Sequence, residues 1–118
     1  METHAAIMGF SQSEKVKSGV IWLSQSLQAA EGLPGPEKQG SDKILRMLMG
    51  MIVQEVRLAE KITGDPAWDA IESRLEQALV MLESGVGAES IVHLTEALSM
   101  VTNIGQRCMT ALKEEGLL

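Results

Sequence analysis

Apolar residues recur at alternating spacings of three and four in the last third of the chain. This spacing predicts a helix over about residues 88–115, with an apolar seam sustained over about three heptads. A seam of this length is stable only when other helices cover it, because water disfavours exposed apolar surface. Its members are Ile91, Leu94, Leu98, Val101, Gly105, Cys108 and Leu112.

The same period predicts three earlier helices, over about residues 12–31, 42–62 and 66–83. Ser11-Gln12-Ser13-Glu14 has the form of a capping box, so the first helix is expected to begin near Gln12. Residues 1–10 are then either frayed helix or disordered. Gly32 serves as a helix stop, and Ser41 is the expected N-cap of the second helix.

The residues between these segments predict the connections. Residues 32–40, which include Leu33-Pro34-Gly35-Pro36, form the one long loop. Thr63-Gly64-Asp65-Pro66 ends one helix and starts the next, and Ser84-Gly85-Val86-Gly87 is a tight turn. The 118 residues therefore predict one domain, an all-α antiparallel (up-and-down) four-helix bundle. The longer first loop permits either an adjacent or a diagonal arrangement of the first two helices.

The second helix carries the most anomalous residue of the chain. Its expected core face is broad and apolar, and Glu55 falls near the centre of that face. A carboxylate there needs hydrogen-bond partners or a second subunit, and without a cation or donors its pKa is raised. Glu55 is therefore a buried polar candidate, unless the helical phase is different and its side chain turns outward. The face comprises Ile44, Leu45, Leu48, Met51, Ile52, Val56, Leu58, Ala59 and Ile62.

The first helix leaves apolar residues outside its core stripe. That stripe contains small and medium residues, and Gly19 within it indicates a close helix approach. Ile21 and Trp22 lie outside the stripe, and an exposed tryptophan is a suitable interface anchor. The predicted partner-binding residues are Ile21, Trp22, Gln25 and Ala29. The alternative is that Trp22 packs under residues 1–10 or under the Pro-rich loop.

The net charge of −6 comes entirely from the second half of the chain. Residues 1–50 carry five acidic and five basic residues, and the remainder carries eleven and five. This distribution disfavours nucleic acid and anionic membrane as partners, because both require basic clusters. No segment has the length of a transmembrane helix, and a cytoplasmic location is the simplest interpretation. The one cysteine, Cys108, excludes an internal disulfide.

One group of side chains on the last helix has the spacing required for chemistry. Glu89, His93 and Glu96 share a helix face. Carboxylates with a histidine occur in di-iron bundles, and an exposed histidine on a bundle can carry a phosphoryl group. The motif occurs once and no lysine lies near His93, so a boundary histidine beside a glutamate is the favoured interpretation. We therefore predict no metal site, no cofactor and no catalytic set.

The sequence thus favours a non-enzymatic helical bundle that serves protein interaction or oligomerisation, such as a small acidic chaperone or adaptor. The expected partner is a protein, with a homodimer as the expected assembly. The alternative is a phosphorelay or metal-binding bundle that uses His93, Glu55 or both.

Overall fold

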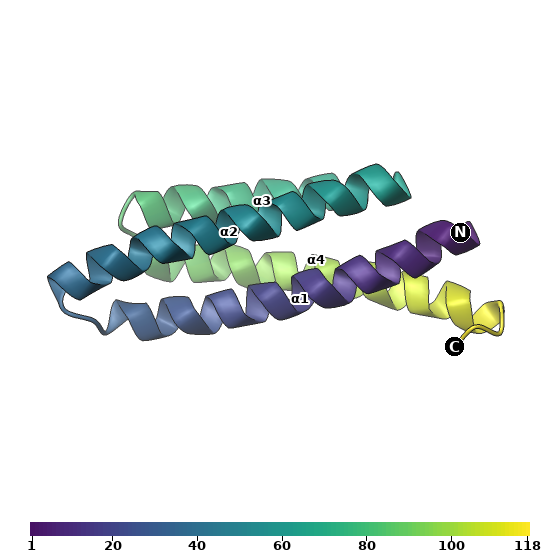
Figure 1. The fold of residues 1–118 in the computed structure, drawn as a ribbon, viewed down its shortest axis with the longest axis horizontal. Coiled ribbons are helices and arrows are strands. Elements are labelled where there is room, and N and C mark those ends of the chain that lie inside the picture. Colours follow the sequence, from purple (N-terminus) through teal and green to yellow (C-terminus); the bar gives the residue numbers. More distant parts are fainter.

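A computed structural model describes all 118 residues and contains four α-helices. They are α1 (Thr3–Glu31), α2 (Gly35–Thr63), α3 (Ala67–Glu83) and α4 (Gly87–Glu114). Each helix runs antiparallel to the one before it, and the whole measures 53 × 21 × 18 Å (Figure 1). The predicted all-α four-helix bundle is confirmed.

The order of the helices around the bundle is the order of the chain. The packed pairs are α1 with α2, α2 with α3, α3 with α4, and α4 with α1. The first two helices are therefore adjacent, which settles the choice that the sequence left open. Both chain ends lie at the same end of the bundle (Figure 1).

The expected start of the first helix is wrong. Helix α1 begins at Thr3, not at Gln12, and the Glu2 carboxylate caps it by accepting hydrogen bonds from the backbone N–H groups of His4 and Ala5. Residues 3–10 are thus helical rather than frayed. Ser13 faces inward on this longer helix and is 2% exposed, so the Ser11–Glu14 motif is not a helix start.

The expected loop over residues 32–40 is also wrong. Only Gly32-Leu33-Pro34 separates the first two helices, and α2 begins at Gly35. Pro36 lies in the first turn of α2, where its missing N–H would have no helical partner in any case. Ser41 is therefore inside α2, and its hydroxyl donates to the Lys38 carbonyl oxygen instead of capping a helix. The prolines start this helix rather than extending a loop.

The predicted stop-and-start signal after α2 is confirmed. Gly64 ends the helix with φ 69°, a left-handed conformation that favours glycine. The Asp65 carboxylate accepts a hydrogen bond of 2.9 Å from the Ala67 backbone N–H, and Pro66 precedes the first residue of α3.

The core contains one continuous set of buried apolar residues contributed by all four helices. On α3 the helical period predicts one core face, and the structure buries all of its members except the half-buried Leu79, with Trp68 completely buried. The members of this face are Trp68, Ile71, Leu75, Ala78, Leu79 and Leu82. On α4 the seam is buried from Leu94 to Leu112, although Ile91 and Leu98 lie at its edge and Ile104 is also buried. The seam residue Gly105 lies where α1 comes close to α4, since a Cβ built on it would be 2.8 Å from Ser13 Oγ.

The expected core face of α2 is wrong by part of a turn. The buried residues are Leu45, Met49, Val53, Val56 and Ala59. Several residues assigned to the core are instead exposed, namely Ile44, Leu48, Met51 and Leu58. Because apolar residues cover more than half of the circumference of α2, their pattern alone does not define which part faces inward. The exposed remainder becomes part of the candidate site.

Candidate functional site

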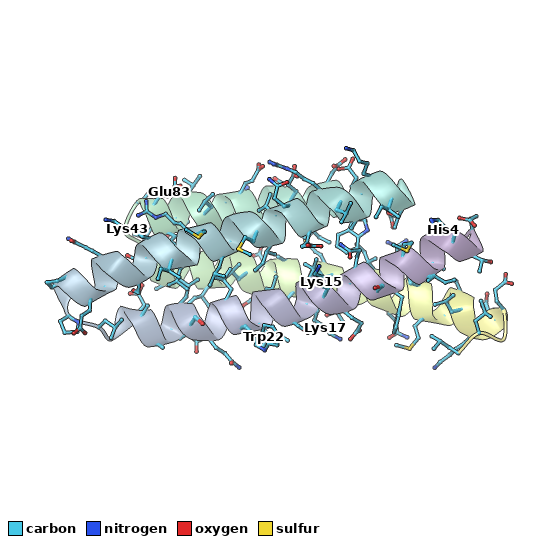
Figure 2. All side chains as sticks on the ribbon, in the orientation of Figure 1. His4, Lys15, Lys17, Trp22, Lys43 and Glu83 are labelled. Carbon is cyan, nitrogen blue, oxygen red and sulfur yellow. The ribbon has the colours of Figure 1, made fainter.

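A groove between α1 and α2 is a hollow lined mainly by hydrophobic residues. It has a volume of about 410 Å³, and six of its ten lining residues are hydrophobic. Trp22 and Ser26 line it on α1, and Leu48 and Met51 line it on α2. Figure 2 shows Lys15 between the two helices and Trp22 at the outer edge of α1.

Gly19 gives the groove its depth. A Cβ on this residue would lie 3.3 Å from Ile52 Cγ1, so the missing side chain lets Ile52 pack directly on the α1 backbone. The buried residues Val16 and Leu23 flank Gly19 on the floor. The close approach expected from Gly19 is therefore present.

The α2 side of the groove continues into an exposed stripe that also follows a heptad spacing. Ile44, Leu48, Met51 and Leu58 are 61%, 41%, 58% and 44% exposed, and Met47 beside them is 68% exposed. The spacing of four, three and seven residues keeps these side chains in line along about 21 Å of helix. We call these five residues the α2 stripe.

Glu55 occupies the one polar position on the line of the stripe. Its Oε1 lies 2.9 Å from Lys15 Nζ, and its Oε2 accepts a hydrogen bond of 3.1 Å from Gln12 Nε2. The Glu55 side chain is 30% exposed, so it lies at the edge of the α1–α2 contact and not at the centre of a core face. The hydrogen bond from Gln12 and the ion pair with Lys15 hold the pKa of Glu55 below its ordinary value. A raised pKa is expected only in the absence of a cation or donors, and here both a cation and a donor reach the carboxylate.

The predicted partner-binding residues do not all meet in this groove. Trp22 is 68% exposed and lines it, so Trp22 is not covered by residues 1–10 or by the turn after α1. Gln25 and Ala29 are exposed on α1 but outside the lining, and Ile21 is half-buried outside the lining. The sequence pattern does not predict the α2 stripe as a surface, because four of its five residues belong to the expected core face of that helix. The available signal was that α2 has more apolar residues than one core-facing side of a helix can hold.

The three residues considered for metal or phosphoryl chemistry are placed differently. His93 is half-buried, and its Nδ1 has no hydrogen-bond partner. Glu96 Oε2 pairs with an Arg74 guanidinium nitrogen at 2.8 Å, which joins α3 to α4, and Glu89 is exposed. No group of three or more histidine, cysteine or acidic side chains lies close enough together to hold a metal ion.

No family model, characterised protein or solved structure matches this chain. The geometry of the surface is therefore the basis for any statement about function. None of the four helices combines the length and apolar content needed to cross a bilayer.

Proposed function

We propose that this protein is a non-enzymatic interaction module that binds an amphipathic helix of a protein in the α1/α2 groove. The observation that carries the proposal is the exposure of Trp22 and Met51 on opposite sides of an apolar groove. Amphipathic helices bind such grooves through side chains at spacings of three and four, which the α2 stripe repeats. Methionine side chains adapt to different partners, and tryptophan is a frequent anchor of binding energy.

The scarcity of charge along the groove supports the same proposal, since Lys15 and Glu55 at one end are the only charged residues among the ten that line it. No charged residue occurs in residues 18–30 of α1 or in residues 47–54 of α2. Protein interfaces are depleted of charge at their centres, where the surrounding water is excluded. The Lys15–Glu55 pair lies beyond this uncharged part, as polar groups do at the rim of an interface. A cytoplasmic location is part of the proposal, since the lone cysteine is a buried free thiol and needs no oxidising compartment.

A synthetic peptide tests the groove. The probe is an amphipathic helix of roughly 18 residues, long enough to cover the α2 stripe, with leucines on one face and neutral polar residues on the other. Trp68 is completely buried, so a change in tryptophan emission on titration reports on Trp22. We expect a shift to shorter wavelength that saturates.

The matched variants are Met51→Glu and Val92→Glu. Met51 is 58% exposed and lies in the groove, whereas Val92 is 57% exposed and lies on α4. We expect Met51→Glu to weaken peptide binding at least about tenfold and Val92→Glu to leave it unchanged. Equal affinity of the two variants, or no emission change with the wild type at about 1 µM protein, where a modest interface between copies does not form, would refute the proposal.

A further inference from the structure

The two halves of the bundle differ in charge in a way that bears on the identity of the partner. Residues 1–63, which include α1 and α2, carry seven acidic and seven basic residues. Residues 64–118, which include α3 and α4, carry nine acidic and three basic residues. The whole net charge of −6 is thus on the half of the bundle that lies away from the groove.

We infer that the occupant of the groove is a second copy of this chain, bound by a two-fold axis that brings the α1/α2 faces together. This inference rests on the proposed function of the groove. Two neutral faces meet in this arrangement, and the two acidic halves point away from each other, which minimises repulsion between copies that each carry −6. A strongly basic partner would gain little at a face with equal numbers of acidic and basic residues.

The face also has the self-complementarity that a two-fold interface requires. In such an interface the same patch serves both copies, so it must contain a protruding part and a recess. Trp22 protrudes at the α1 edge, and the groove between α1 and α2 lies beside it. The partner's apolar side chains can fill this hollow while its own hollow receives the same groups.

The position of Glu55 indicates how the copies are oriented. In a parallel arrangement of the two α2 helices, each Glu55 and its paired Lys15 would face the same two charges of the other copy, and like charges at short distance repel. An antiparallel arrangement avoids this contact. Met51 is midway between Ile44 and Leu58 along the stripe. The two-fold axis therefore passes near Met51, and Ile44 of each copy lies opposite Leu58 of the other.

Sedimentation measurements between about 5 and about 200 µM test the dimer, since a modest interface forms in this range. We expect a concentration-dependent increase from 12.8 kDa toward twice that mass. Met51→Glu should weaken dimerisation at least about tenfold, whereas Val92→Glu should not. Glu55→Leu should strengthen it, because the stripe becomes continuous, and loss of folding cannot produce that result.

Three results would overturn the inference: a wild-type monomer at all concentrations, equal effects of Met51→Glu and Val92→Glu, or weaker association of Glu55→Leu. A monomer that still binds the peptide would refute the second copy and keep the proposed groove. Failure of both experiments would refute both proposals.

Salt and cross-linking refine the test. Raising the salt concentration should leave the dimer unchanged or strengthen it by screening the acidic halves, whereas a complex held by opposite charges would weaken. With Cys108 buried, Met51→Cys should form a disulfide-linked dimer in oxidising buffer. Ile44→Cys should not, because in the antiparallel arrangement it faces the other end of the stripe. Efficient cross-linking through Ile44→Cys would overturn that arrangement.

Discussion

The contact between α1 and α4 at Gly105 predicts a substitution series with different signs. A Cβ on Gly105 would lie 2.8 Å from Ser13 Oγ and 3.4 Å from Ser13 Cβ. The Ser13 hydroxyl donates a hydrogen bond of 2.8 Å to the Phe10 carbonyl oxygen, and Ser13 is 2% exposed. The hydroxyl must therefore rotate and lose this bond to admit even a methyl group.

The size of each effect follows from these contacts. Loss of the Ser13 hydrogen bond costs about 1 kcal/mol, and replacing glycine by alanine within a helix gains about the same, so Gly105→Ala should be close to neutral. Gly105→Leu adds three further carbons to a packed site, which costs roughly 1–3 kcal/mol. For a chain of this length each kcal/mol corresponds to about 4 °C in melting temperature, so Gly105→Leu should melt roughly 4–12 °C lower.

A double-mutant cycle identifies the atom responsible. Ser13→Ala removes the oxygen that a new Cβ would meet. In that background Gly105→Ala keeps its gain in helix propensity and should stabilise the protein by about 1 kcal/mol. Urea unfolding followed by circular dichroism measures all four proteins. An equal effect of Gly105→Ala in both backgrounds, or a higher melting temperature for Gly105→Leu, would refute the close approach.

Three other predictions follow from polar groups and turns. Because the pKa of Glu55 is lowered in the folded protein, Glu55 stabilises the fold above the ordinary carboxyl pKa, and this contribution is lost as the pH falls through the lowered value. Acidification from about pH 6 to about pH 3 should therefore destabilise the wild type more than Glu55→Gln in urea melts. Burial raises the pKa of the Cys108 thiol, so a chromogenic disulfide reagent at pH 8 should label it only after unfolding, and rapid labelling of the native protein would contradict its burial. Gly64→Ala places a side chain in the left-handed conformation that ends α2 and should cost about 1 kcal/mol, whereas Gly40→Ala, inside α2, should be neutral or stabilising in the same thermal melts.

The parts of the fold that the sequence predicts are those where the local signals agree. The α3 face is correct because most apolar residues of that helix lie on one side, with Val80 the one large apolar residue left exposed. The α2–α3 turn is correct because Gly64, Asp65 and Pro66 each favour the same boundary. The bundle itself follows from four helical periods with short connections.

Errors arise where two signals compete. Ser11-Gln12-Ser13-Glu14 resembles a helix start, but a helix that begins at Thr3 buries Ala6 and Gly9 against the rest of the bundle, and this packing outweighs a local cap. Pro34 and Pro36 are compatible with either a loop or a first turn. On α2, apolar residues cover more of the helix circumference than the other helices contact. The pairing of Glu55 with Lys15 and Gln12 marks the border between the buried part and the exposed part.

The sequence predicts the α1 side of the groove but not the α2 side. Trp22 is recognisable from α1 alone because it lies outside a narrow core stripe, and the structure leaves it exposed. The other side of the groove depends on the rotation of α2 about its axis, which the contacts of Ile52 with Gly19 and of Glu55 with Lys15 determine. Those contacts join residues that are about 30 to 40 positions apart in sequence, so no local pattern contains them.

The shared location of the two chain ends has a consequence for covalent attachment. Residues 1 and 118 lie at one end of a molecule 53 Å long, and the turn between α1 and α2 lies at the other (Figure 1). A tag, fluorophore or surface linkage fused to either terminus is therefore held at the same pole. Immobilised through such a linkage, the molecule presents its opposite pole outward and leaves the long side with Trp22 accessible from solution.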